Sequence, residues 1–208
     1  MSSGFADDPH SEQGLPCPSN RFHITDYNRL QRIEAPLVAK RGGELEDLGI
    51  TGNFDPTHLR AIHKYLFQDV FAWAGEFRVV NISKGSSSFG PALHIAAALA
   101  DTLAKLHAES LLTGLSPHTF AARAAFYLGE INAIHPFREG NGRTQREFLR
   151  QLALQAGHPL SWAGFTQNEM TDASILSHKV GDNTQLTAII ERALYSTRDQ
   201  VSRQTPQP

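Results

Sequence analysis

The sequence predicts an all-α fold with one short β-hairpin, on three observations. Apolar residues recur at helical spacing along most of the chain, prolines and glycines stand where these periodic segments begin and end, and residues 77–91 switch to a turn-rich pattern. The 208 residues suit a single domain with one core. We expect a flexible arm at residues 1–20, the domain at residues 21–197 and a flexible tail at residues 198–208.

The first helix is expected to begin at Thr25, because threonine caps helix N-termini well. Pro36 should kink this helix or end it near Ala35, since proline lacks the N–H that a helix interior uses. The side chains expected to face the core are those of Tyr27, Leu30, Ile33 and Leu37.

Asp55 followed by Pro56 predicts the start of the second helix, because an aspartate cap before a proline at the first helical position is a strong start signal. Its apolar residues recur at helical spacing as far as residues 73–75. Glycines and serines then predict the turn of a hairpin within residues 77–91. Later helices are expected at residues 92–112, 117–134, 168–178 and 183–196, with one of about 15 residues that ends at Ala156.

The composition argues against several classes of function. Nineteen basic and 21 acidic residues give a formal net charge of −2, so no overall positive field attracts nucleic acid. No apolar run reaches membrane-spanning length and the first residues do not form a secretion signal, which predicts a cytoplasmic protein without a membrane partner. The lone Cys17 lies between two prolines, where we expect a free, exposed thiol.

Residues 135–146, which read His-Pro-Phe-Arg-Glu-Gly-Asn-Gly-Arg-Thr-Gln-Arg, concentrate groups suited to phosphate chemistry. The Gly-Asn-Gly run at residues 140–142 stands where a helix begins, and glycines let successive backbone N–H groups turn toward an anion. Arg143 and Arg146 leave this helix on one face, where two guanidinium groups suit a polyphosphate. Taken alone, such a turn is more often an ordinary helix start with solvated arginines.

Two more side chains of this run point to a reaction at phosphate. Glu139 would repel a phosphate unless a divalent cation lay between them, and Mg²⁺ commonly takes one or two carboxylates together with phosphate oxygens. The alternative is a carboxylate that caps the helix or interacts with its dipole. His135 precedes a proline, so we expect an extended backbone, a ring directed out of the bundle and a near-neutral pKa that suits a general base.

This run resembles the signature of the Fic family, HPFx(D/E)GNGRxxR, and matches it at every specified position. The matching residues are His135, Pro136, Phe137, Glu139, Gly140, Asn141, Gly142, Arg143 and Arg146. The resemblance implies the helical Fic fold and transfer of AMP from ATP to a Ser, Thr or Tyr hydroxyl of a target protein. It assigns the base to His135, Mg²⁺ to Glu139, the α- and β-phosphates to Gly140, Asn141, Gly142 and Arg143, and the γ-phosphate to Arg146.

The resemblance extends from about residue 25 to 195. Residues 67–75 and Arg78 look like the segment before the family's flap, and residues 83–91 look like the flap, a hairpin over the active site whose backbone pairs with the target as an added strand. By resemblance, Ser88, Phe89 and Gly90 dock the target, while Lys84 and Gly85 approach the nucleotide. A core position for Phe89 and a solvated position for Lys84 are the alternatives.

Gly142 favours AMP transfer over phosphorylation, because a lysine, which a phosphorylating relative can carry at this position, would compete for the phosphate space. Three alternatives stay open. The first is transfer of another phosphate-linked group, the second is the Fic domain of a secreted effector, and the third is a module that binds nucleotide without reaction.

Fic enzymes are usually inhibited by a helix bearing (S/T)xxxE(G/N), whose Glu pairs with the second signature arginine, here Arg146. The nearest segment runs from Thr187 to Glu191, but Arg192 follows where Gly or Asn is expected, so we interpret it as an ordinary amphipathic helix. Since an uninhibited enzyme would harm its host, the resemblance implies a toxin with a small separate antitoxin that supplies a Glu to Arg146. Bacterial toxins of this class include some that modify type II topoisomerase subunits, which makes such a subunit a candidate target.

Overall fold

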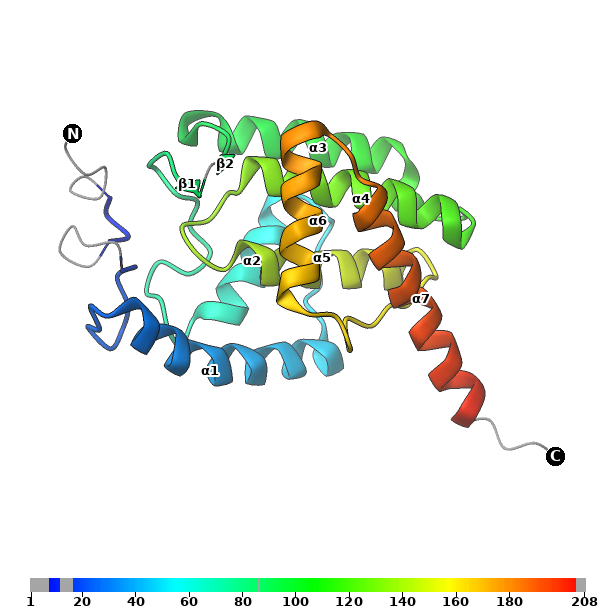
Figure 1. The fold of residues 1–208 in the computed structure, drawn as a ribbon, viewed down its shortest axis with the longest axis horizontal. Coiled ribbons are helices and arrows are strands. Elements are labelled where there is room, and N and C mark those ends of the chain that lie inside the picture. The colour runs from blue at the N-terminus through cyan, green and yellow to red at the C-terminus, as the bar shows by residue number, and fades with distance from the viewer. Residues whose placement is uncertain (1–7, 12–16, 86, 205–208) are drawn as a thin grey trace.

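The computed structural model describes residues 8–11, 17–85 and 87–204, and this part of the chain is helical apart from one hairpin, as predicted (Figure 1). In chain order the elements are α1 (Tyr27–Leu48), α2 (Pro56–Phe67), β1 (Ser83–Lys84), β2 (Ser87–Ser88), the 3-10 turn η1 (Ala92–His94), α3 (Ile95–Ala108), the 3-10 turn η2 (Ser110–Leu112), α4 (Pro117–Ile134), α5 (Asn141–Gln155), α6 (Gln167–Val180) and α7 (Thr184–Gln204).

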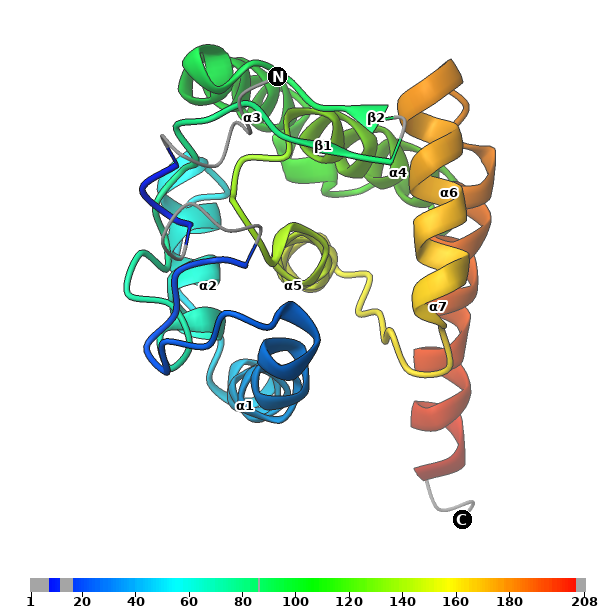
Figure 2. The same cartoon turned by 60° about the vertical axis from the view of Figure 1, so that its left-hand side comes forward.

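Helix α5 lies at the centre of the bundle. Figure 2 views it nearly end on, with α2 to one side, α4 above, α1 below and the pair α6 and α7 on the opposite side. It packs directly against α2 and α4, and its apolar side chains Phe148, Leu149 and Leu152 are buried in the core. The loop between α4 and α5 is therefore held at both ends by packed helices.

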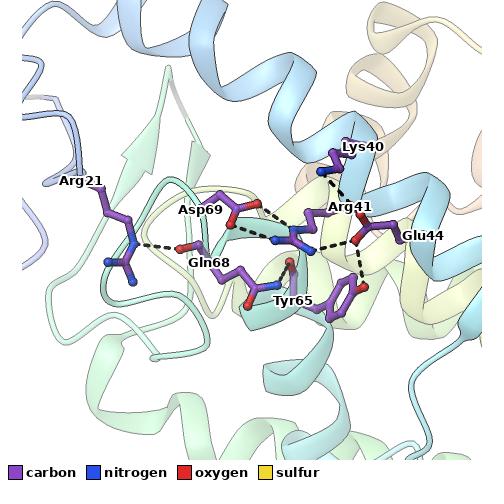
Figure 3. Close-up of polar contacts among 7 residues, drawn as sticks. All are labelled: Arg21, Lys40, Arg41, Glu44, Tyr65, Gln68 and Asp69. Atoms are coloured by element: carbon purple, nitrogen blue, oxygen red, sulfur yellow. Dashed lines mark hydrogen bonds and ion pairs between the residues drawn. The ribbon is translucent and has the colours of Figure 1, made fainter.

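Helix α1 is joined to the end of α2 by a polar network (Figure 3). The Arg41 guanidinium donates to both carboxylate oxygens of Asp69, at 2.7 and 3.0 Å, and to Glu44 at 2.8 Å. The Tyr65 hydroxyl donates to the same Glu44 carboxylate at 2.9 Å. These bonds hold α1 beside α2, and α1 in turn brings side chains to the loop before α5.

The cap of the first helix is one residue later than predicted. Asp26, rather than Thr25, accepts a hydrogen bond from the N–H of Arg29 at 2.8 Å. The predicted start of the second helix is confirmed, since Asp55 caps it and Pro56 is its first residue. Aspartate accepts from the first turn at both helix starts, as expected for an N-cap carboxylate.

Of the two alternatives expected at Pro36, an end of the helix near Ala35 is wrong, and a kink stays a prediction. Pro36 lies inside the helix, which continues to Leu48. Leu30 and Val38 are buried on either side of the proline, so burial of one apolar face offsets the lost backbone hydrogen bond.

Three later boundaries also differ from the predictions. Helix α2 ends at Phe67 rather than near residues 73–75, because the following N–H groups return in tight turns to the Phe67 carbonyl. The segment expected as one helix at residues 92–112 is divided into η1, α3 and η2, and the α-helix ends at Ala108, just before Ser110, Leu111 and Leu112, which all have positive φ. Helix α7 continues to Gln204, beyond the expected start of a flexible tail at residue 198. No helix in the described ranges is long and apolar enough to cross a membrane.

The described part of the N-terminal segment packs against the domain. The expectation of an exposed thiol is wrong, because Cys17 is 1% exposed and donates to the carbonyl of Ile24 at 3.2 Å. Asp8 is also buried and accepts from Arg138 of the signature loop at 2.6 Å. Residues 8–11 and 17–20 therefore do not behave as the free arm that the polar composition predicted.

Candidate active site

The signature residues lie together where α4 ends and α5 begins. Gly140 caps α5 with a φ of 80°, and a side chain at this position would overlap the Phe67 ring, so both the backbone and the packing require glycine. The first N–H groups of α5 have no partner within the helix, and the helix dipole adds partial positive charge there. This arrangement suits an anion such as phosphate.

The Asn141 side chain supports the loop from within. Its Oδ1 accepts from the N–H of Phe137 at 2.9 Å, its Nδ2 donates to the Phe137 carbonyl at 2.7 Å, and the residue is 3% exposed. Asn141 can therefore contribute to a phosphate cradle only through its backbone, whereas Gly142 is exposed and leaves the approach to α5 open.

The two signature arginines lie in different environments. Arg143 forms an ion pair with Glu34 of α1, and its guanidinium lies over the Phe67 ring, 4.7 Å from the ring centre. Glu34 is 3% exposed and its Oε2 atom lacks a hydrogen-bond partner, so burial raises the pKa of this carboxyl although Arg143 lowers it in part.

Arg146 forms no ion pair with any residue in the described ranges. Burial lowers the pKa of its guanidinium, and the charge of Arg143 lowers it further. A Cβ at Gly142 would lie 3.4 Å from Nη1 of Arg146, which places this guanidinium beside the N-terminus of α5. A partly buried cation without a carboxylate next to free N–H groups is an attractive position for a phosphate.

Glu139 lies at the edge of this cradle. The Tyr27 hydroxyl donates to its Oε2 at 2.7 Å and the N–H of Gly140 donates to its Oε1 at 3.0 Å. Tyr27 was expected in the core but is 37% exposed, and its burial together with the Glu139 carboxylate raises the pKa of its phenol. The bond from the Gly140 N–H supports the alternative that Glu139 acts as a helix-capping carboxylate. It still leaves lone pairs on the Glu139 oxygens that can bind a cation.

Mg²⁺ fits this arrangement. The described residues contain no group of three or more His, Cys, Asp or Glu side chains that could hold a metal. A cation at Glu139 must therefore take most of its ligands from phosphate and water, which is the coordination that Mg²⁺ prefers in phosphate-transfer sites.

His63 of α2 holds the Glu139 backbone, a role that sequence reasoning missed. The N–H of Gly75 donates to Nδ1 of His63 at 2.8 Å, so Nε2 carries the ring proton and donates to the Glu139 carbonyl at 3.1 Å. Its ring stacks on Phe137 with centroids 3.9 Å apart, and burial lowers its pKa to about 3. Nothing local distinguishes this histidine, because its role depends on residues 12 and 76 positions away.

The backbone of His135 differs from the prediction. Its φ of 49° and ψ of 64° are left-handed rather than extended, because its N–H caps α4 by donating to the Ile131 carbonyl at 3.0 Å. Nδ1 lies 3.3 Å from the Asn132 carbonyl, which only accepts, so Nδ1 carries the proton and Nε2 is left unprotonated.

The ring of His135 is partly buried instead of pointing out of the bundle. Burial lowers its pKa to about 3, and the charges of Arg78, Lys84 and His178 act in the same direction. The expectation of a near-neutral pKa is therefore wrong. The imidazole is neutral at physiological pH, which is the form that accepts a proton, and negative phosphates beside it would raise its pKa.

Phe89 of the flap covers His135. The two rings stack with centroids 3.7 Å apart, and the centroid of the His178 ring of α6 lies 5.4 Å from that of Phe89. Nε2 of His178 donates to the Ser88 carbonyl at 3.0 Å, which fastens the second strand to α6.

The short hairpin predicted within residues 77–91 is present, with two residues in each strand. Ser83 pairs with Ser88 and Lys84 with Ser87 in antiparallel register. Lys84 and Gly85 are exposed at its tip, and Gly85 has a φ of 57° with open space around it. Lys84 thus occupies the solvated position that we considered, at a range from which its charge still acts on His135.

The segment from Thr187 to Glu191, which is the nearest match to an inhibitory motif, does not contact Arg146 through its glutamate. Glu191 pairs with His118 of α4. Around it, the buried side chains in the described part of α7 are Leu186, Ile189, Ile190, Ala193 and Leu194. This pattern agrees with an ordinary amphipathic helix, and no side chain described in residues 184–194 of α7 brings a carboxylate to Arg146.

Comparisons with known proteins agree with this geometry. The sequence model described as "Fic/DOC family" matches residues 53–153. The chain is 41% identical over 189 residues to protein adenylyltransferase VbhT of Bartonella schoenbuchensis, covering 91% of this chain but 39% of that protein. It is 37% identical over 196 residues to the probable protein adenylyltransferase Fic of Escherichia coli, covering 93% of this chain and 96% of that protein.

Solved structures show the same fold. The VirB-translocated effector BepC of Bartonella tribocorum, determined with bound AMPPNP, is similar with a TM-score of 0.83 and 27% identity, covering 88% of this chain and 95% of that chain. The N-terminal Fic domain of a Bartonella quintana effector with bound ADP gives a TM-score of 0.82 and 29% identity, covering 88% and 93%.

Proposed function

This chain belongs to the Fic/DOC family, and on that premise we propose that it is a protein adenylyltransferase that transfers AMP from ATP to a Ser, Thr or Tyr hydroxyl of a target protein. Relatives named protein adenylyltransferases, at 37% and 41% identity, support this activity. So does the similarity to a structure with bound AMPPNP, an analogue of ATP.

The observation that carries the proposal is the neutral imidazole of His135 at the end of α4, on the loop that leads into the N-terminus of α5. Its unprotonated Nε2 accepts the proton of the target hydroxyl while the hydroxyl oxygen bonds to the α-phosphorus. The bond from that phosphorus to the bridging oxygen breaks, and pyrophosphate leaves with the electron pair. Because AMP passes to the hydroxyl without a covalent intermediate on the chain, the remaining contribution of the chain, beyond this proton transfer, is orientation and charge stabilisation.

The nucleotide phosphates are assigned to the start of α5. The backbone N–H groups of Asn141 and Gly142 and the guanidinium of Arg143 are assigned to the α- and β-phosphates, and Arg146 to the γ-phosphate. Gly140, whose own N–H donates to Glu139, contributes the turn that opens this cradle. Mg²⁺ at Glu139, when bound, supplies positive charge that neutralises phosphate oxygens. Lys84 and Gly85 approach the nucleotide from the flap, and Ser88, Phe89 and Gly90 contact the target. Because both backbone groups of Gly90 are already bonded, to Ala133 and to Arg78, Gly90 contributes contact rather than strand pairing.

Incubation of the purified chain with Mg²⁺ and α-labelled ATP in a bacterial lysate tests this activity. We expect label on a discrete protein band, absent with His135→Ala and present with His118→Ala, a matched surface histidine. Label from γ-labelled ATP would instead identify phosphorylation. Absence of α-label from every band, with Mg-ATP binding intact, would favour a module that binds nucleotide without reaction.

We further propose that the protein is the toxin of a toxin–antitoxin pair and that a small partner supplies a Glu to Arg146. Support comes from the absence of any carboxylate at Arg146 among the described residues and from the engagement of Glu191 with His118. A type II topoisomerase subunit is the candidate target. If Glu191→Gly increases the activity of the purified chain, inhibition lies within the chain and the antitoxin proposal fails.

The Fic domain of a secreted effector is the second candidate, favoured by the similarity to VirB-translocated effectors of Bartonella. The two candidates differ in where the target is found. Labelling of a bacterial protein supports the toxin, whereas labelling confined to a eukaryotic lysate supports the effector.

A further inference from the structure

Arg78 lies between the signature loop and the base of the flap, and it is 1% exposed. Its guanidinium donates to four backbone carbonyls. Nε donates to His135 at 2.8 Å and Nη2 to Ile134 at 3.0 Å, both at the end of α4. Nη1 donates to Val80 at 2.7 Å and Nη2 also to Gly90 at 2.5 Å, on the two sides of the flap.

The charge of Arg78 is unusual for a buried site. Buried guanidinium groups ordinarily pair with a carboxylate, whereas Arg78 has no ion pair within the described ranges, and burial lowers its pKa. The acceptors from α4 lie at the negative end of that helix dipole, which partly balances the charge. A leucine or methionine could fill the space without this electrostatic cost, so the guanidinium is used for its four directed hydrogen bonds.

These bonds join two parts of the proposed site that are separate in sequence. His135 adopts a left-handed backbone that few residues favour, and Arg78 holds its carbonyl while the Arg78 N–H donates to the Pro136 carbonyl at 2.9 Å. Val80 and Gly90 bracket the hairpin, so the same group sets the position of the flap. The N–H of Gly90 donates to the Ala133 carbonyl at 2.9 Å, which adds a second tie to α4.

We propose that Arg78 is a positioning residue that locks His135 and the flap into one geometry, so that a hydroxyl presented along the flap meets Nε2 of His135. This inference rests on the proposed adenylyltransferase activity. None of the four bonds goes to α5 or to Arg146, so Arg78 acts on the approach of the target hydroxyl and leaves the phosphate cradle alone. Misplacement of reacting groups by about 1 Å lowers rates on the order of 100-fold.

The test compares Arg78→Lys with Arg60→Lys. Lysine keeps the charge but cannot reach four carbonyls, while Arg60 makes one comparable bond, from Nε to the Gly75 carbonyl at 2.7 Å, on the outer side of α2. We expect transfer from α-labelled ATP to fall at least about tenfold in Arg78→Lys, with the Kd for Mg-ATP within about twofold of the wild type. Hydrogen exchange should accelerate at residues 80–90 while that of α3 is unchanged, and Arg60→Lys should match the wild type.

Two outcomes would overturn the proposal. Unchanged transfer and unchanged exchange at residues 80–90 would mean that Arg78 positions nothing. Acceleration of exchange across all helices, with transfer and Mg-ATP binding reduced together, would show a purely structural arginine.

A measurement on the wild-type chain keeps the proposal testable if Arg78→Lys does not fold or no transfer is found. Four persistent bonds should restrict rotation of the guanidinium, so the two Nη groups of Arg78 should give separate nitrogen resonances. A single averaged resonance would show that the guanidinium rotates freely, and this would contradict the proposed positioning role of Arg78. Because this readout requires no reaction, failure of the positioning role is distinguished from failure of the proposed activity.

Discussion

The ring of Phe89 stacks on the ring of His135, with centroids 3.7 Å apart and planes inclined by 16°. The flap residue expected to contact the target therefore also covers the proposed base. Burial is the largest cause of the low pKa of His135, and Phe89 supplies part of that burial. Target docking and proton transfer are thus linked through a single aromatic contact.

Phe89→Ala should raise the pKa of His135 from about 3 toward its usual value near 6.5. The direction follows because burial disfavours the imidazolium, and removal of the covering ring returns water to it. Titration of the His135 ring resonances by NMR checks this, with Val79→Ala, an exposed apolar residue before the flap, as the control. If the pKa of His135 stays near 3 in Phe89→Ala, residues other than Phe89 account for the burial of the His135 ring.

Acid should destabilise the fold through His63. Its folded pKa of about 3 lies below the value of about 6.5 in the unfolded chain, so the unfolded state binds more protons as the pH falls from 6.5 toward 3. Each unit of difference corresponds to about 1.4 kcal/mol. Urea unfolding at pH 7 and pH 5 should show a loss of stability that is smaller in His63→Gln. Equal losses of stability in the wild type and in His63→Gln would mean that another group, for example His135, causes the acid sensitivity.

If Arg146 holds the γ-phosphate, the wild-type chain should bind ATP more tightly than ADP, and Arg146→Ala should remove this difference. The Arg146 guanidinium, which has no ion pair among the described residues, is assigned to the γ-phosphate, so its loss should weaken ATP binding by about tenfold or more and leave ADP binding nearly unchanged. Calorimetry with both nucleotides measures this. The control is Arg150→Ala, because Arg150 is paired with Glu147 at 2.8 Å and should affect stability without changing the ATP-to-ADP ratio.

Arg143→Ala should destabilise the protein, whereas Glu34→Gln should not. Removal of Arg143 leaves a buried carboxylate without its cation, which costs about 3–5 kcal/mol for fully buried pairs and less here because the Arg143 side chain is 33% exposed. The double variant should recover most of the stability lost on unfolding in urea. If Arg143 also holds phosphate, the stable double variant should still bind Mg-ATP more weakly, and unchanged binding would limit Arg143 to its ion pair.

Gly140→Ala should disrupt the signature loop more than Gly157→Ala disturbs the end of α5. The two glycines have nearly the same φ, 80° and 79°, so the backbone strain is matched at about 1–2 kcal/mol. Only Gly140 faces a side chain that a Cβ would overlap, namely Phe67, while Gly157 has open space. Gly140→Ala should lower the unfolding temperature and raise the Kd for Mg-ATP more than Gly157→Ala does. Equal effects of the two substitutions would mean that Phe67 moves aside freely.

Much of the fold could be predicted because its signals are local. Asp55 with Pro56, and Pro117 after Ser116, mark helix starts through contacts within one turn, and the structure has both helices there. The signature also lies within twelve consecutive residues, so its loop and helix come together whatever the rest of the chain does. The errors at Pro36 and at Cys17 arose where tertiary burial outweighed a local preference.

The sequence by itself determined the fold class, the hairpin and the run of residues that carries the proposed chemistry. Only the tertiary structure decided the partners and charge states of those residues. Arg78 reaches His135 across 57 positions and Tyr27 reaches Glu139 across 112, and no local pattern specifies such pairs. The pKa of His135 likewise depends on the ring of Phe89 and on the charges around it. Backbone conformation follows from neighbours along the chain, whereas burial and electrostatics follow from neighbours in space.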